Sequence, residues 1–113
     1  MTHQQLEEYL LSFPNVWLDF PFGEEFSVYK VGHKETGEGK IFAIVADKRK
    51  PLHVSFKCDP QLALTLREKY ETVVPGYHLN KKHWNTLILT GQLSDQEVKD
   101  LANLSYQLVT KAA

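Results

Sequence analysis

Residues 26–58 read FSVYKVGHKETGEGKIFAIVADKRKPLHVSFKC, and the arrangement of the whole chain follows from this stretch. It contains three short apolar segments, at 26–31, 40–46 and 52–58, separated by connections rich in glycine, lysine and proline. Segments of this length bounded by turn residues are typical of β-strands joined by short loops. The stretch therefore predicts a three-stranded antiparallel meander.

The second and third segments differ in how many faces they bury. Ile41 to Val45 is apolar at every position, as expected for a strand that is covered on both sides. In the third segment, apolar residues at every second position alternate with His53, Ser55 and Lys57. We therefore expect that strand to bury only one face.

Helix signals lie on both sides of the meander. Thr2 followed by Gln5 is a capping box, and Pro14 ends the helix that it starts. Ser94 followed by Glu97 is a second capping box ahead of a long C-terminal helix. Helical spacing predicts that the inner face of that helix consists of Val98, Leu101, Ala102, Ser105, Leu108 and Val109.

A further helix is expected after the meander, because Asp59 is an N-cap acid and Pro60 suits the first helical position. Its apolar stripe is Leu62, Ala63, Leu66 and Tyr70. Residues 84–89 predict another strand, which Gly91 ends.

Two connecting segments are not expected to be central strands. Residues 16–23 lead into an aromatic turn that is too proline-rich for the middle of a sheet, and residues 73–76 return the chain. The sequence therefore predicts an α+β fold in a single domain spanning residues 1–113. Its elements are helix, three-stranded meander, helix, strand and helix, with the helices packed on one face of an antiparallel sheet.

Composition bounds the class of protein. The chain has 113 residues, of which 42% are apolar and 24% charged, as is usual for soluble globular proteins. No run approaches the roughly 20 apolar residues of a membrane span, and the N-terminal residues lack a signal-peptide pattern. We expect a cytoplasmic monomer that does not associate with membranes.

The sequence offers no motif for catalysis or metal binding. The one cysteine, Cys58, follows the buried side of its strand, away from His53 and Lys57. His78 and His83 match no zinc-ligand spacing, and phosphate-loop, dinucleotide and hydrolase motifs do not occur. We therefore expect no catalytic residue, metal or cofactor, and enzymatic activity is the least favoured alternative.

Positive charge is concentrated in the middle of the chain. Residues 1–25 carry five acidic and no basic side chains, whereas residues 26–58 carry seven basic and three acidic ones. Local clusters can bind anions even though the formal net charge is −1. The alternative is that these lysines are solvated loop tips. The candidate phosphate-contacting residues are Lys48, Arg49, Lys50, Lys81 and Lys82.

Residues 75–86, PGYHLNKKHWNT, combine aromatic, amide and cationic side chains. They could stack on or hydrogen-bond to a ligand. The structural alternatives are that Trp84 packs against the terminal helix, Asn80 caps the turn and His78 bonds a backbone carbonyl. The candidate groove residues are Tyr77, His78, Asn80, His83 and Trp84.

The order of these motifs resembles the MmcQ/YjbR family over nearly the whole chain. The matching blocks are KCDP at 57–60, LR at 66–67, VPGYHLNKKHW at 74–84 and SYQLV at 105–109. FPFG at 20–23 resembles the aromatic turn of the family, with Phe20 where aspartate is usual. The resemblance implies a CyaY-like fold and DNA binding through a double-wing arrangement of hairpins.

Two functions remain open. The first is weak, largely non-specific DNA binding, with Lys48 to Lys50 as one wing and Lys81 and Lys82 as a second anchor. Against it, dedicated DNA-binding domains are usually much more basic than a chain of pI near 6.5. The second is a protein-interaction or small-ligand groove between the 77–84 block and the turn at 20–22.

Overall fold

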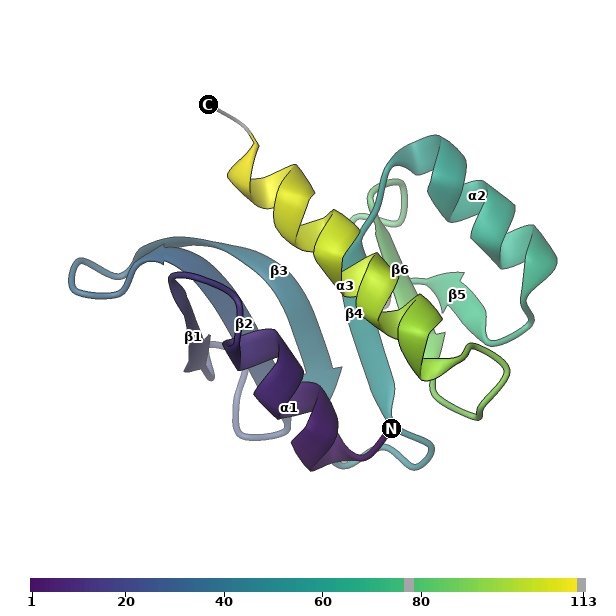
Figure 1. Ribbon diagram of the computed structural model, residues 1–113, viewed down its shortest axis with the longest axis horizontal. Helices are drawn as coiled ribbons and strands as arrows, with labels where there is room; N and C mark the ends of the chain where they lie inside the picture. Colours follow the sequence, from purple (N-terminus) through teal and green to yellow (C-terminus); the bar gives the residue numbers. More distant parts are fainter. Residues whose placement is uncertain (77–78, 112–113) are drawn as a thin grey trace.

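The computed structural model describes residues 1–76 and 79–111, which form a six-stranded antiparallel sheet and three helices (Figure 1). The strand order across the sheet is β1-β2-β3-β4-β6-β5. This arrangement confirms the predicted α+β class and the antiparallel meander, which is β2-β3-β4. The elements are α1 (His3–Leu11), β1 (Val16–Asp19), β2 (Phe26–His33), β3 (Glu38–Ala46), β4 (His53–Lys57), α2 (Pro60–Lys69), β5 (Val73–Pro75), β6 (Trp84–Ile88) and α3 (Asp95–Thr110).

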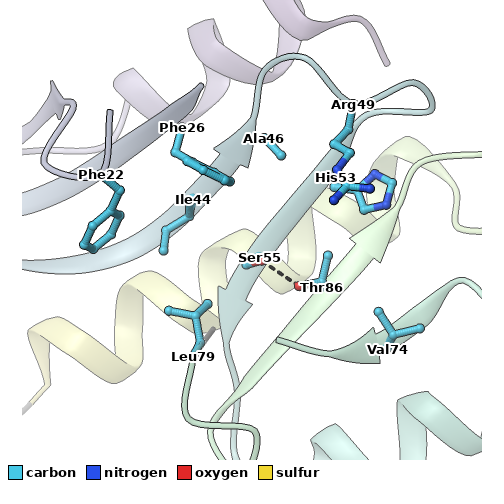
Figure 2. A pocket seen from close by; sticks show the side chains of 10 residues that line it. All are labelled: Phe22, Phe26, Ile44, Ala46, Arg49, His53, Ser55, Val74, Leu79 and Thr86. Carbon is cyan, nitrogen blue, oxygen red and sulfur yellow. Dashed lines mark hydrogen bonds between the residues drawn. The ribbon is translucent and has the colours of Figure 1, made fainter. Parts of the chain in front are cut away.

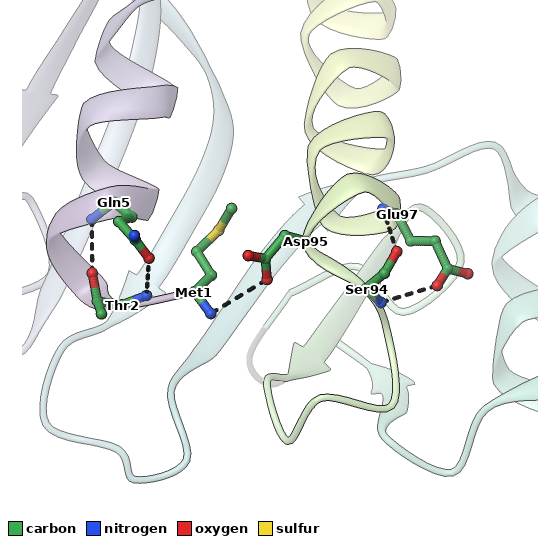
Figure 3. A network of polar contacts seen from close by, with 6 residues as sticks. All are labelled: Met1, Thr2, Gln5, Ser94, Asp95 and Glu97. Atoms are coloured by element: carbon green, nitrogen blue, oxygen red, sulfur yellow. Dashed lines mark hydrogen bonds and ion pairs between the residues drawn. The ribbon is translucent and has the colours of Figure 1, made fainter.

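Both predicted capping boxes are present (Figure 3). The Thr2 hydroxyl accepts from the Gln5 amide at 3.1 Å, and the Gln5 side chain accepts from the Thr2 amide at 2.9 Å. Ser94 and Glu97 make the same reciprocal pair at 3.1 and 2.9 Å. These bonds satisfy amide groups that the first turn of a helix leaves without partners, so they fix where α1 and α3 begin.

All three helices cover the same face of the sheet. Figure 1 shows α1 and α3 lying across it, and their buried side chains join those of the central strands in one hydrophobic core. For α2, the evidence is Asn85 of β6, whose amide donates to the Ala63 carbonyl at 3.2 Å. Asn85 is the cross-strand neighbour of the buried Phe56, so it points to the helix face.

A β-bulge in β3 shapes the core. Tyr29 pairs with Ala43 and Lys30 with Ile41, so Phe42 is an extra residue with no partner on β2. Its ring is fully buried. β3 pairs with β4 only from Ala43 to Ala46, so Phe42 has no partner on β4 either. The Ser105 hydroxyl of α3 bridges this gap, because it donates to the Phe42 carbonyl and accepts from the Lys57 amide at 2.9 Å.

Two short strands at the edges of the sheet were not predicted. β1 ends before Pro21, and β5 ends on Pro75. Proline is tolerated at a sheet edge, where one side of the strand needs no hydrogen-bonding partner. The rule that excludes proline from central strands therefore did not apply to these segments.

Two predicted exposures were wrong. Leu108 is 40% exposed, because the buried stripe of α3 is the narrower set of Val98, Ala102, Ser105 and Val109. Ser55 was placed on the open face of its strand, yet it is only 9% exposed. The second face of the sheet is thus partly covered as well.

The bridging role of Ser105 predicts a measurable loss of stability. We expect Ser105→Ala to lower the free energy of unfolding by about 1–3 kcal/mol, because it leaves the buried Phe42 carbonyl and the part-buried Lys57 amide without their partner. Urea denaturation measures the effect. Gln107→Ala, at an exposed position on the same helix, is the matched control and should stay within about 0.5 kcal/mol of wild type. Equal effects of the two substitutions would contradict the bridge.

The second capping box predicts a dependence of stability on pH. The Ser94 amide and then the Tyr70 hydroxyl hold the pKa of Glu97 below its ordinary value of 4.5. A lowered pKa in the folded state means that the contribution is present above the ordinary pKa and lost as the pH falls through the folded value. In urea titrations from neutral to acid pH, wild type should therefore lose its stability advantage over Glu97→Gln. A constant difference across that range would refute the assignment.

Candidate functional site

The face of the sheet opposite the helices carries a cavity of about 660 Å³ (Figure 2). Its lining is mostly aliphatic and aromatic, with polar groups at the floor and at one end. The lining residues are Phe22, Phe26, Ile44, Ala46, Arg49, His53, Ser55, Val74, Leu79 and Thr86.

The floor consists of neighbouring side chains from adjacent strands. In one row, Ile44 of β3 pairs with Ser55 of β4, which pairs with Thr86 of β6, and Val74 of β5 completes it. A second row contains Phe26, Ala46 and His53. Side chains directly opposite each other on an antiparallel sheet point to the same face. The register of the sheet therefore fixes the shape of the floor.

Three loops provide the rim. Phe22 comes from the turn between β1 and β2, Arg49 from the turn between β3 and β4, and Leu79 from the connection between β5 and β6. Phe22 is 56% exposed, which is unusual for a phenylalanine. Gly76 allows Leu79 to approach, because an added Cβ would lie 3.3 Å from the Leu79 side chain and 2.8 Å from Trp84.

Some polar groups of the cavity have hydrogen-bonding partners in the protein, and one has none within the described residues. The hydroxyls of Ser55 and Thr86 bond each other at 2.7 Å (Figure 2). His53 Nδ1 lies 2.8 Å from the Pro51 carbonyl, so this nitrogen carries the proton. The Arg49 guanidinium makes no hydrogen bond or ion pair with any residue in 1–76 or 79–111. The cavity thus has a cation at one end and a hydrophobic body.

The turn that carries Arg49 is held in place. Asp47, two residues earlier, bonds His3 of α1 at 2.7 Å and accepts from the Ser27 hydroxyl at 2.6 Å. Its amide donates to the Glu25 carbonyl at 2.9 Å. These contacts fasten the turn to α1 and β2.

The candidate phosphate-contacting residues divide between two ends of β4. Lys48, Arg49 and Lys50 precede this strand, and Lys48 lies 3.8 Å from the Glu25 carboxylate. Lys81 and Lys82 are both exposed. They lie beside the other end of β4, because they closely precede Trp84, which pairs with Lys57. The five-residue strand between them spans roughly 15 Å, more than the screening length of about 8–10 Å.

Another cation of the middle segment has an acidic partner. The Lys30 ammonium donates to the Asp19 carboxylate at 2.9 Å and holds the pKa of that carboxyl below its ordinary value. This pair lies on the open face of the sheet, beyond the cavity.

The described part of the 77–84 block has structural contacts of its own. Asn80 Oδ1 accepts from the Lys82 amide at 3.0 Å, which is the turn-capping alternative. Arg67 of α2 anchors this turn by donating to Asn85 Oδ1 at 2.7 Å, to the Trp84 carbonyl at 3.3 Å and to the Lys81 carbonyl. The turn is thereby fixed against α2.

Of the five candidate groove residues, the three that the structure describes do not line the cavity. Asn80, His83 and Trp84 are absent from its lining, to which the block contributes Leu79. His83 and Trp84 are half-buried. Tyr77 and His78 lie outside the described residues.

Other chemistry finds little support in the described ranges. No group of three histidine, cysteine, aspartate or glutamate side chains there could hold a metal ion. Cys58 is buried, and burial raises the pKa of its thiol, which disfavours the reactive thiolate. None of the described helices is long and apolar enough to cross a membrane.

Sequence reasoning missed most of the cavity. It assigned Arg49 to phosphate binding and left His53 and Ser55 on an open strand face, and it gave Phe26 and Thr86 no role. Two signals pointed to the site. The predicted groove between the 77–84 block and the turn at 20–22 involves the segments that contribute Leu79 and Phe22 to the rim. The segment 41–45 is apolar on both faces, so a second apolar surface must exist opposite the helices.

The chain is similar to several known proteins. The sequence model of the YjbR family matches residues 11–108. YbdF of Escherichia coli is 37% identical over 107 residues, covering 95% of this chain and 83% of that protein. YjbR of Escherichia coli is 41% identical over 70 residues, covering 62% of this chain and 59% of that protein.

Two solved structures share the fold. A Deinococcus radiodurans protein with a DUF419 domain superposes with a TM-score of 0.92 at 36% identity, covering 98% of this chain and 80% of that one. A Pseudomonas syringae protein superposes with a TM-score of 0.78 at 29% identity, covering 96% of this chain and 99% of that one.

Proposed function

This chain belongs to the YjbR family, and we propose that it binds a small organic molecule on the sheet face that the helices leave open. The cavity of about 660 Å³ carries this proposal. Pockets for small ligands are typically about 300–1,000 Å³, mostly apolar, with a few polar groups that orient the ligand. The cavity matches each of these properties.

The construction of the cavity favours binding as well. Its floor comes from five strands of one hydrogen-bonded sheet, so little of it has to become ordered when a ligand enters. A preformed site loses less conformational entropy on binding than a mobile one. At the mouth, a ligand would cover part of the exposed Phe22 ring, and burial of apolar surface contributes about 25 cal/mol per Å².

The proposal predicts that a neutral hydrophobic probe binds in the cavity. N-phenyl-1-naphthylamine should fluoresce more strongly with the wild-type protein. Ala46→Trp should weaken its binding at least about tenfold, since the larger side chain would fill the floor. Val74→Trp approaches the same space from the edge strand β5 and should act alike.

Leu64→Trp is the matched control for these substitutions, because Leu64 is 51% exposed on α2, outside the cavity. It should bind the probe as wild type does, and circular dichroism establishes that each variant is folded. Binding that survives both cavity substitutions, or no binding to wild type, would refute the proposal.

DNA binding is the second candidate function. One observation favours it: Lys50, Lys81 and Lys82 are exposed and have no acidic partner in residues 1–76 and 79–111. Lysines of this kind can contact phosphates without reading the base sequence. Only a few phosphate contacts are available, for two reasons. The candidate cations are separated along β4, and Lys30 and Lys48 have acidic partners.

The DNA hypothesis predicts strongly salt-dependent binding. With about four phosphate contacts, duplex affinity should fall about 100-fold between about 50 and about 200 mM salt. Fluorescence anisotropy of a labelled duplex measures this. Substituting Lys48, Arg49 and Lys50 together by alanine, or Lys81 and Lys82 together, should weaken binding and reduce the salt slope. If the triple variant binds the duplex as wild type does, residues 48–50 are not a DNA-contacting wing. If the double variant does so, Lys81 and Lys82 are not the second anchor.

A further inference from the structure

We propose that the ligand of the sheet-face cavity is an amphipathic carboxylic acid, whose carboxylate pairs with Arg49 and whose hydrocarbon body lies over the floor. This inference rests on the proposed function, because it names the class of molecule that the same cavity would take. The guanidinium without a protein partner carries the argument.

Asp47, two residues before Arg49, and Glu25, whose carbonyl accepts from the Asp47 amide, both have other partners for their carboxylates. The Asp47 carboxylate is occupied by His3 and Ser27. Ser27 is buried on the helix face, so this carboxylate lies on the far side of the sheet from the cavity. Glu25 has Lys48 at 3.8 Å. The positive charge at the end of the cavity therefore has no acidic partner among the described residues.

The chemistry of this cation selects the anion. A guanidinium presents a planar fork of N–H donors that matches the two oxygens of a carboxylate. A phosphate monoester carries about −1.5 to −2 charges near neutral pH, and a single cation would leave part of that charge unmatched beside an apolar floor. Among the described residues that line the cavity, Arg49 has no second Lys or Arg beside it. One cation and one hydrophobic body fit a monoanion.

The turn that carries Arg49 is suited to hold such a charge. The contacts of Asp47 fasten it to α1 and β2, and the Arg49 amide donates to the Ala46 carbonyl at 3.2 Å. Ala46 is itself part of the floor. The guanidinium thus extends from an anchored backbone at the end of the apolar surface, so a bound acid would have one preferred orientation.

The apolar floor of the cavity determines which hydrocarbon groups the ligand can carry at the end away from Arg49. From His53 the cavity continues to Ser55 and then to Leu79, whose side chain projects into it with Ile44 nearby (Figure 2). His53 and Ser55 are two residues apart on β4, which is about 6–7 Å. The hydroxyls of Ser55 and Thr86 already bond each other, so the floor does not require a polar partner from the ligand. A ring system or an acyl chain fits this surface.

Competition between two matched probes tests the inference. 2-Naphthoate and 2-naphthamide share one ring system and differ in charge, and each is titrated against N-phenyl-1-naphthylamine bound to the wild-type protein. The carboxylate should displace the dye about 10- to 100-fold more effectively than the amide, the range expected for charge-assisted hydrogen bonds.

Two substitutions assign that preference to one side chain. Arg49→Gln should abolish the preference for the carboxylate over the amide. Lys50→Gln removes the same charge one residue later, at an exposed position outside the cavity lining, and should preserve the preference. Equal loss in both variants would mean that general surface charge, and not Arg49, selects the anion, which would overturn the inference.

The remaining outcomes separate the inference from the proposed function. If naphthoate and naphthamide displace the dye equally from wild type, the carboxylate inference fails while the cavity remains a binding site for neutral molecules. If the dye does not bind to wild type, the proposed function itself fails, and the inference falls with it.

Discussion

All three helices lie on one face of the sheet, and no helix of the described residues lies against the opposite face. Central strands that are apolar on both sides then have only loops to cover their second face. The turn with Phe22 and the connection with Leu79 cover it partly, and Ile44 and Thr86 are buried beneath them. The candidate site lies in the part of this face that the loops leave open.

The bulge at Phe42 links the two faces. Because of the bulge, the Phe42 ring points into the core on the helix side of the sheet. There it stacks on the Phe13 ring, with 5.6 Å between the ring centroids. Ile44, two positions on, remains on the open face. Regular pairing with β4 stops at the bulge, and the Ser105 hydroxyl replaces it. One β3 segment thereby serves both the core and the cavity floor.

Electrostatics distinguish the two candidate functions. Lys30 and Lys48 have acidic partners, and the candidate phosphate-contacting residues lie at opposite ends of β4. A single Arg49 beside an apolar cavity suits one small anion, whereas a duplex requires several cations at once. Membership of the YjbR family fixes the fold and leaves the choice between these functions to the geometry of the site.

Local structure could be predicted from the amino-acid sequence: both capping boxes, the helix start at Asp59 and the meander, because caps, turns and alternation depend on residues close together in the chain. It also indicated a second apolar face at 41–45. The floor of the cavity could not be predicted in this way. β6 inserts between β4 and β5, which makes Ser55 and Thr86 neighbours although they lie 31 residues apart. The place of β6 in the strand order depends on contacts between residues far apart in the chain, and the short turns that specify the meander do not encode it.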